Sequence, residues 1–158
     1  MKSGRMKSAR MTVNVHASCV ALGSRAILLL GPSGVGKSDL ALRLIDAGAR
    51  LVADDRCELW LKKGHLFARS PASIAGMIEV RGLGIIALPF CRQAGVALAV
   101  RLGKNDARLP KRRFYAAPLK GAGPVPMITM DGREPSAPAR IRLALRAFSR
   151  GLFTETFK

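Results

Sequence analysis

The spacing of apolar and polar positions predicts a chain that alternates between strands and helices. Residues 26–30 (AILLL) are continuously apolar, which is typical of a strand covered on both faces. The β-prone stretch 13–22 before them predicts another strand. After them, residues 38–47 carry apolar side chains at helical spacing, and Gly48 is placed to end that helix. The pattern therefore predicts a strand–loop–helix unit in the first third of the chain.

The rest of the chain continues the mixture of strands and helices. Residues 51–53 predict a short buried strand, and residues 57–69 predict a hairpin that turns through Lys62–Gly64. Further elements are expected as a strand–loop–strand at 78–89, strands at 95–102 and 125–130, a mostly irregular basic segment at 104–126, and an amphipathic helix at 140–150. This order of elements predicts an α/β fold.

Length and composition limit the class of protein. With 158 residues, of which 49% are hydrophobic, the chain suffices for one globular domain. No apolar run approaches the ~18 residues of a membrane span, and the basic N-terminus lacks the core of a signal peptide. The chain has an odd number of cysteines and no CxxC pair, which favours a cytoplasmic protein. We expect Cys19, Cys57 and Cys91 to be small buried thiols. We expect a basic tail at 1–11, one domain at 12–150 and a second tail at 151–158.

The net charge of +17 is large for this length. Residues 92–158 hold 14 Lys and Arg against four Asp and Glu. Such a surface favours anionic partners, or is a solvated basic surface. A nucleic-acid-binding module would show binding that falls steeply with salt. Aromatic residues make up only 5% of the chain and do not alternate with basic ones, so we expect no nucleic acid as a partner. Because no apolar run is long enough to span a membrane, we expect no membrane partner either.

The sequence GPSGVGKS after the apolar strand matches the phosphate-loop pattern G-x-x-x-x-G-K-[ST]. Glycines let the backbone curl so that its N–H groups face phosphate oxygens, and the following helix adds its positive end. Lys37 would contact the phosphates, and the Ser38 hydroxyl would ligate Mg²⁺. The predicted nucleotide-binding residues are Gly31, Pro32, Ser33, Gly34, Val35, Gly36, Lys37 and Ser38.

Two adjacent aspartates, Asp54 and Asp55, follow the short strand 51–53, where active groups of open α/β sheets lie. A GTPase would carry an NKxD sequence, which is absent, and a motor ATPase is not indicated. A small kinase needs a base for the acceptor hydroxyl and a carboxylate for magnesium, so Asp54, Asp55 and Glu79 are candidates. Because strand side chains alternate, only one aspartate is expected to face the nucleotide. A solvated turn or helix cap is the alternative interpretation of the pair.

Three stretches together resemble the HPr kinase/phosphorylase family: HASCVAL, GPSGVGKSDLALRLIDAGARLVADD and IEVRGLGII. The similarity covers the family's catalytic domain, roughly residues 12–148. It implies a P-loop core with a mixed twisted sheet and flanking helices, similar to the phosphoenolpyruvate carboxykinase catalytic core. It also implies a Mg²⁺- and ATP-dependent serine kinase that phosphorylates the carrier HPr in the sugar phosphotransferase system. The family also removes that phosphate with inorganic phosphate, releasing pyrophosphate, and is typically hexameric.

The resemblance also implies roles for individual residues. It implies a catalytic His16, Lys37 on the phosphates, Asp55 as the base with Asp54 as second choice, Ser38 and Glu79 as magnesium ligands, and Arg108 in DARLP as a loose match to a catalytic arginine. Arg81, Gly82 and Gly84 lie in the signature that serves both reaction directions.

One family feature is missing. The Pro-Val-Arg-Pro-Gly-Arg-Asn pattern linked to dephosphorylation is replaced by ITMDGREPSAP, where Arg133 is the nearest substitute. The kinase direction is therefore better supported than phosphorolysis. A P-loop kinase for a small molecule remains the alternative function.

Overall fold

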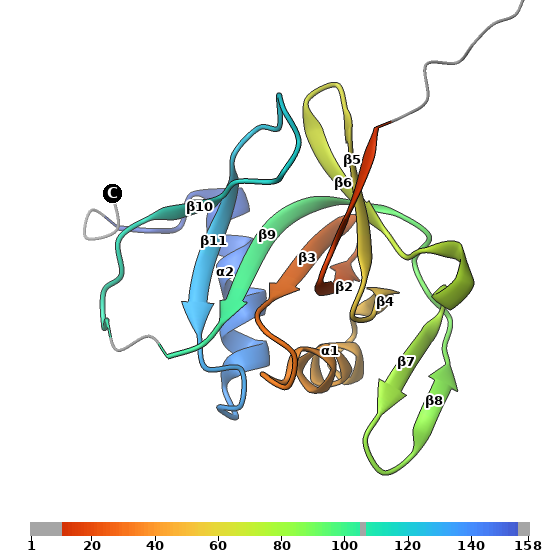
Figure 1. Cartoon of the computed structure of the whole chain (residues 1–158). Coiled ribbons are helices and arrows are strands. Elements are labelled where there is room, and N and C mark those ends of the chain that lie inside the picture. The colour runs from red at the N-terminus through yellow and green to blue at the C-terminus, as the bar shows by residue number, and fades with distance from the viewer. Residues whose placement is uncertain (1–10, 105–106, 155–158) are drawn as a thin grey trace, which may run out of the picture.

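The computed structural model describes residues 11–104 and 107–154. Except for Met11, the predicted N-terminal tail lies outside the described residues, as do residues 155–158 of the second tail. In the described residues one large mixed sheet is flanked by two α-helices, with a small two-stranded sheet to one side (Figure 1). The predicted α/β class, with a mixed sheet and flanking helices, is confirmed. No helix in the described part of the chain is long and apolar enough to cross a membrane.

The elements follow the predicted order closely. They are β1 (Thr12–Val15), β2 (Ala17–Leu22), β3 (Arg25–Leu30), α1 (Lys37–Asp46), β4 (Arg50–Ala53), β5 (Cys57–Lys62), β6 (His65–Arg69), the 3-10 turn η1 (Ala72–Ile74), β7 (Met77–Val80), β8 (Gly84–Ala87), β9 (Ala94–Leu102), β10 (Arg113–Tyr115), β11 (Val125–Met130) and α2 (Ala137–Arg150).

The pairing of the strands decides where their ends open. The large sheet has the order β1-β5-β6-β9-β3-β2-β4, and β11, with β10 beside it, also pairs with β9. Strand β9 runs parallel to β3 and to β11, whereas the other pairs are antiparallel. The carboxyl ends of β3, β9 and β11 therefore open at one edge of the sheet, the lower edge in Figure 1.

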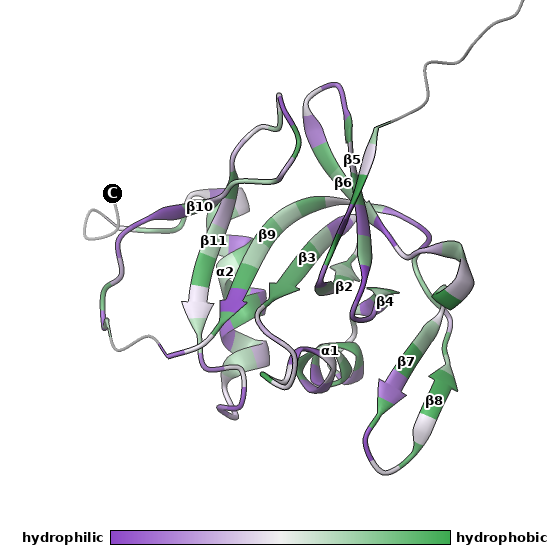
Figure 2. Ribbon diagram, in the orientation of Figure 1, coloured by the Kyte–Doolittle hydropathy of each residue, from purple (hydrophilic) through white to green (hydrophobic). Residues whose placement is uncertain are grey.

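Strand β3 is buried on both faces, as its continuous apolar run predicts. Ile27 and Leu29 belong to the core cluster that contains buried side chains of α1 and α2. Leu28 and Leu30 belong to the second cluster, with residues of β5 and β6. Figure 2 shows hydrophobic colour along most of this strand. Two cores on opposite faces hold β3 rigid, and the loop that follows it inherits that position.

The predicted single strand 13–22 is wrong, because the chain bends at His16 and forms two strands. Strand β1 pairs with β5, whereas β2 pairs with β3 and β4. The two halves thus pair with different neighbours, and a β-prone pattern carries no information about that choice. The bend has a functional consequence, since it leaves the His16 side chain half-exposed at a strand junction.

Smaller differences appear elsewhere. The short strand β10 lies in the segment predicted to be irregular, where it pairs with β11. Helix α2 begins three residues before the predicted start, with Pro138 in its first turn, where a missing amide hydrogen is tolerated. The predicted hairpin is confirmed, and its Trp60 and Phe67 rings stack across the strands with centroids 5.8 Å apart.

Gly48→Ala is expected to lower the free energy of unfolding by roughly 1 kcal/mol, because an L side chain is strained at positive φ. Gly48 follows the C-terminus of α1 with a φ of 112°. Nothing lies within 4 Å of a Cβ added there, so the cost is conformational and not steric. Urea unfolding measures it. Gly103→Ala is the matched control, since its Cβ also meets open space without positive φ. Equal stabilities of the two variants would contradict this explanation.

Candidate active site

The phosphate loop, residues Gly31–Ser38, joins β3 to α1 and depends on its glycines. Gly36 is the N-cap of α1 with a φ of 101°, a conformation that glycine adopts without strain. Gly31 has a φ of 148°, and a Cβ there would lie 2.8 Å from Val35 Cγ1. The glycine spacing read from the sequence therefore has a steric cause, and it brings the loop backbone to the N-terminus of α1.

Lys37 turns back into the loop. Its side chain is buried, and its ammonium donates hydrogen bonds to the carbonyl oxygens of Gly31 at 2.7 Å and Pro32 at 3.1 Å. Burial lowers the pKa of Lys37, and the carboxylates of Asp55 and Asp54 oppose that shift. Because an ammonium group has three donors, one remains for an anionic ligand.

Asp54 lies just beyond β4 and connects three elements. Its Oδ1 accepts hydrogen bonds from Ser38 Oγ at 2.6 Å and from Ser18 Oγ at 3.1 Å. Its Oδ2 accepts one from the backbone N–H of Glu79 at 3.1 Å. The residue is 8% exposed. Asp54 therefore joins Ser38, whose hydroxyl is predicted to ligate magnesium, to β2 and β7 through hydrogen bonds.

Asp55 occupies a different environment from its neighbour. Its Oδ1 lies 3.4 Å from His16 Nε2, which lies 3.2 Å from Ser33 Oγ of the phosphate loop. The side chains of His16 and Asp55 are 46% and 57% exposed. Asp55 thus presents a carboxylate to solvent at the rim of the loop, where an incoming hydroxyl can reach it.

The alternation of strand side chains, from which we expected only one aspartate to face the nucleotide, does not extend to Asp55. Strand β4 ends at Ala53, and Asp55 has a φ of 70°, which turns the chain. The Asp55 N–H donates to Ser18 Oγ, so one serine supports the turn and also donates to Asp54. Both carboxylates therefore contact residues that belong to the phosphate loop or touch it.

These residues fit a magnesium-bound triphosphate. The structure places an ammonium, a hydroxyl and a carboxylate together at the N-terminus of α1, the donor types that such a group requires. Among the described residues no three His, Cys, Asp or Glu side chains gather as a metal site. Protein sites usually hold magnesium through one or two carboxylates together with substrate phosphates.

Two other predicted residues lie less directly in the site. Glu79 is next to Asp54 through its backbone, and its exposed side chain leaves its role as a magnesium ligand a prediction. Arg108 is exposed in the segment after β9, and it does not line the cavity beside the loop. Its catalytic role also stays a prediction. Arg81, Gly82 and Gly84 are exposed at the turn between β7 and β8.

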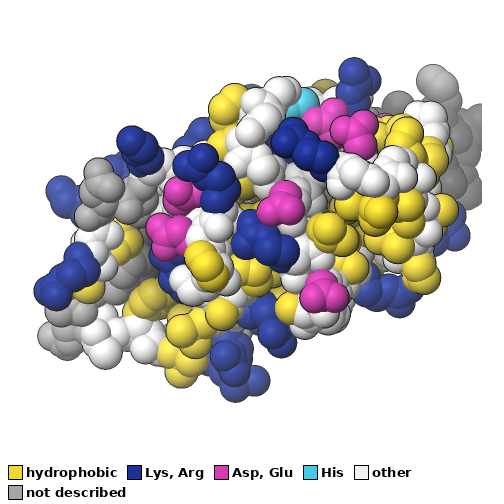
Figure 3. Space-filling view, turned by 90° about the horizontal axis from the view of Figure 1, so that it is seen from below, with side chains coloured by type: hydrophobic (Ala, Val, Ile, Leu, Met, Phe, Trp, Pro, Cys, Tyr) yellow, Lys and Arg dark blue, Asp and Glu magenta, His cyan; other side chains and the backbone are white. Residues whose placement is uncertain are grey.

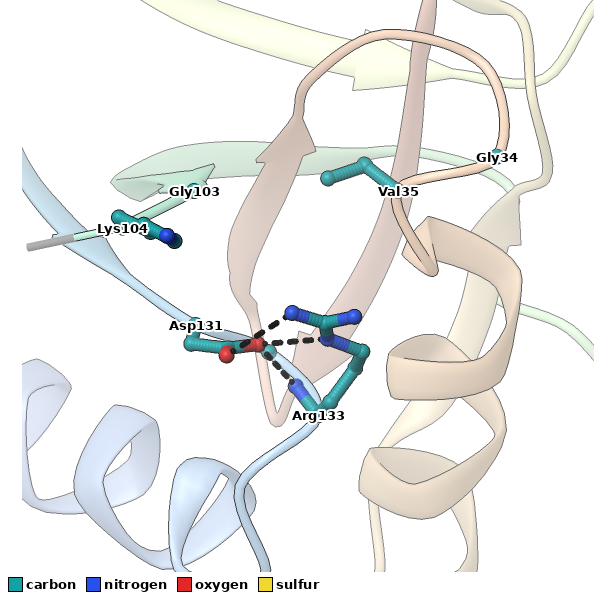
Figure 4. A pocket seen from close by; sticks show the side chains of 7 residues that line it. Gly34, Val35, Gly103, Lys104, Asp131 and Arg133 are labelled. Atoms are coloured by element: carbon teal, nitrogen blue, oxygen red, sulfur yellow. Dashed lines mark hydrogen bonds and ion pairs between the residues drawn. The ribbon is translucent and has the colours of Figure 1, made fainter.

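A cavity of about 280 Å³ lies beside the phosphate loop, and we name it the side cavity. Gly34 and Val35 form one wall, and Gly103, Lys104 and the turn 131–133 form the other (Figure 4). Arg133 donates two side-chain hydrogen bonds to the Asp131 carboxylate, at 3.1 and 3.2 Å, and those bonds lower the pKa of Asp131.

Figure 3 shows the lower face of Figure 1, with acidic and basic side chains interspersed and a hydrophobic area to one side.

Sequence reasoning missed three contributors to this region. Ser18 is fully buried in β2 and bonds to both aspartates, and a lone serine within an apolar strand was the available signal. Lys104 and Asp131 line the side cavity, although they lie in segments with no motif. Arg133 was considered only as a substitute for the missing dephosphorylation pattern.

Comparisons with known proteins agree with this geometry. The sequence profile described as HPr Serine kinase C-terminal domain matches residues 7–95, more than half of the chain. An HPr kinase/phosphorylase of Clostridium tetani is 48% identical over 75 residues, which are 48% of this chain and 25% of that protein. The structure of the Hpr(Ser) kinase/phosphatase from Coxiella burnetii superposes with a TM-score of 0.75 at 28% identity, covering 89% of this chain and 92% of that one. The chain thus spans about a quarter of its curated relative, and it belongs to the HPr serine kinase C-terminal domain family.

Proposed function

We propose that this chain is a Mg²⁺- and ATP-dependent kinase that phosphorylates a serine of the carrier protein HPr. One observation carries the proposal: Lys37, Ser38 and Asp54 gather at one end of the phosphate loop, and an exposed carboxylate, Asp55, stands at its rim. The names of the Clostridium and Coxiella relatives support HPr as the acceptor. We further propose that residues 12–150 form the catalytic unit, with a P-loop core similar to that of phosphoenolpyruvate carboxykinase.

The residues divide the work of phosphoryl transfer. The seryl oxygen of HPr forms a bond to the γ-phosphorus of ATP while the bond to the bridging oxygen breaks and ADP leaves. Asp55 accepts the seryl proton, and His16 orients the Asp55 carboxylate from 3.4 Å. Lys37 binds the phosphates and stabilises the charge that develops on the transferring group. Magnesium, when bound through Ser38 and Glu79, would neutralise phosphate charge, and Asp54 would orient the Ser38 hydroxyl.

Dephosphorylation by phosphorolysis would use the same groups. An oxygen of inorganic phosphate would form a bond to the phosphorus of phosphoseryl-HPr while the bond from phosphorus to the seryl oxygen breaks. Asp55 would pass the proton of the attacking phosphate to the seryl oxygen, and pyrophosphate would leave. Because the family pattern linked to dephosphorylation is absent here, we propose the kinase as the principal direction. The resemblance also supports a homo-oligomer, with a hexamer as the expected size.

Purified protein mixed with HPr, MgCl₂ and ATP is expected to form phosphoseryl-HPr, detected by intact-protein mass spectrometry. Adding phosphate in excess then tests for pyrophosphate release. Lys37→Ala is the control, since it removes the buried ammonium from the loop and should lower transfer by about 100- to 1,000-fold, as the loss of one stabilising donor does. The kinase proposal fails if HPr stays unmodified under conditions in which the protein binds Mg-ATP.

A small-molecule kinase is the second candidate, because the phosphate loop and Asp55 would serve phosphoryl transfer to the hydroxyl of a small molecule as well as to that of a protein. It would show ATP consumption with a metabolite panel and none with HPr. Running both acceptors against the same Lys37→Ala control separates the two functions.

A further inference from the structure

The side cavity lies on the opposite side of the phosphate loop from the two aspartates. The loop leaves β3, and in the sheet β2 and β4 follow on one side, with Asp54 just beyond β4. On the other side are β9 and β11, which run parallel to β3. Gly103 and Lys104 follow β9, and the turn 131–133 follows β11, so the side cavity opens outside the carboxyl ends of these strands (Figure 1). In open α/β sheets that crevice is where ligands bind.

An extended ligand can occupy both places at once. The side cavity shares Gly34 and Val35 with the phosphate loop. A nucleotide whose terminal phosphate lies near Asp55 must direct its other end away from the aspartates, across the loop. The side cavity lies in that direction.

We propose that the side cavity binds the nucleoside end of the nucleotide, with the Arg133 guanidinium as the surface that contacts the base. This proposal rests on the proposed function, since it needs a triphosphate in the phosphate loop. It adds a second binding region to the site and names the residue that makes ATP a better ligand than its phosphate chain alone.

The lining has the size and the polar groups to hold a nucleoside. Its volume of about 280 Å³ lies near the lower end of the range for small-molecule pockets and is enough for a base or a ribose. The Asp131 carboxylate belongs to the wall, where Arg133 pairs with it. The same carboxylate can accept hydrogen bonds from the hydroxyl groups of a sugar.

The guanidinium of Arg133 is held in place and exposed, as a stacking contact requires. Two side-chain hydrogen bonds and the backbone N–H of Arg133 all go to the Asp131 carboxylate, which fixes the position of the guanidinium. The side chain is nevertheless 78% exposed, so a face of the guanidinium plane remains available. Planar guanidinium groups stack on aromatic faces, and no aromatic side chain lines this cavity to compete for the base.

Binding of ATP and of inorganic tripolyphosphate, both with MgCl₂, tests the assignment by isothermal titration calorimetry. Wild-type protein is expected to bind ATP more tightly than tripolyphosphate. Arg133→Ala should raise the Kd for ATP about five- to thirtyfold, the range for one cation–π contact of about 1–2 kcal/mol, and change the Kd for tripolyphosphate less than twofold. Arg142→Ala is the matched control for charge, because Arg142 is exposed on α2 and does not line the cavity.

The outcomes separate this proposal from the proposed function. If Arg133→Ala weakens both ligands equally, Arg133 acts on the phosphates and the nucleoside assignment is wrong. If wild-type protein binds ATP no better than tripolyphosphate, while Lys37→Ala weakens both, the phosphate loop works and the side cavity does not take the nucleoside. Binding of neither ligand to wild-type protein would overturn the nucleotide site itself. Lys104→Ala, a second exposed lining variant, is expected to act in the same direction as Arg133→Ala.

Discussion

Asp55→Asn is expected to lower phosphoryl transfer to the acceptor by about 100- to 10,000-fold, the usual contribution of a general base. Asparagine keeps the size of the side chain and cannot take a proton at neutral pH. The backbone of residue 55 should stay in place, because its N–H bonds to Ser18 and asparagine tolerates a φ of 70° as well as aspartate does. The Kd for Mg-ATP should therefore change little, so the loss appears in kcat.

Two measurements check this expectation on the same samples: calorimetric binding of Mg-ATP and the initial rate of phosphoserine formation. Asp46→Asn is the matched control, because Asp46 is an exposed aspartate at the other end of α1 from the loop. It makes the same charge change and should leave both quantities unchanged. Transfer at a normal rate in Asp55→Asn would remove Asp55 from the role of base and leave Asp54 as the second choice.

The structure gives a physical reason to prefer Asp55 over Asp54 for that role. All the hydrogen bonds that reach Asp54 come from neighbouring protein groups, and its side chain is buried. The oxygens of Asp54 are therefore occupied by protein donors, and burial leaves little room for an incoming seryl hydroxyl. Asp55 is exposed, and within the described residues its carboxylate makes one ion pair, with His16 at 3.4 Å.

The loop, its helix and the aspartate pair could be predicted from sequence because each depends on local rules. Glycine spacing indicates the curl of residues 31–36, and apolar periodicity indicates α1. The buried strand before Asp54 indicates that the aspartate pair lies at a strand end. The bend at His16 could not be predicted, since it depends on which strands β1 and β2 pair with far along the chain. Alternation failed at Asp55 because it holds only while the strand continues, and β4 ends before it.

The side cavity could not be predicted from the sequence for a similar reason. Its lining comes from three separate segments, the phosphate loop, the end of β9 and the turn after β11, which meet only because these strands run parallel. Apart from the phosphate loop, these segments carry no motif. The sequence offered Arg133 only as a loose substitute for a missing pattern, whereas the structure sets it against Asp131 beside the loop.

Asp54→Asn is the second change with a large expected effect. It should lower the free energy of unfolding and also weaken the dependence of ATP binding on magnesium. The amide keeps one acceptor oxygen and replaces the other with a donor. If that donor faces the backbone N–H of Glu79, a buried hydrogen-bond donor loses its partner. If the amide is turned, the Ser38 and Ser18 hydroxyls lose their acceptor. Either arrangement costs about 1–3 kcal/mol of unfolding free energy.

Urea unfolding measures that cost, and Asp39→Asn is the control, since Asp39 is exposed on α1 in an i,i+4 pair with Arg43 worth about 0.5 kcal/mol or less. The same substitution should reduce the dependence of ATP binding on MgCl₂, because Ser38 loses the carboxylate that orients its hydroxyl. Lys37 remains, so ATP without magnesium should bind the variant much as it binds wild type. A variant that unfolds at the wild-type urea concentration and keeps full magnesium dependence would show that Asp54 neither stabilises this junction nor orients the metal ligand.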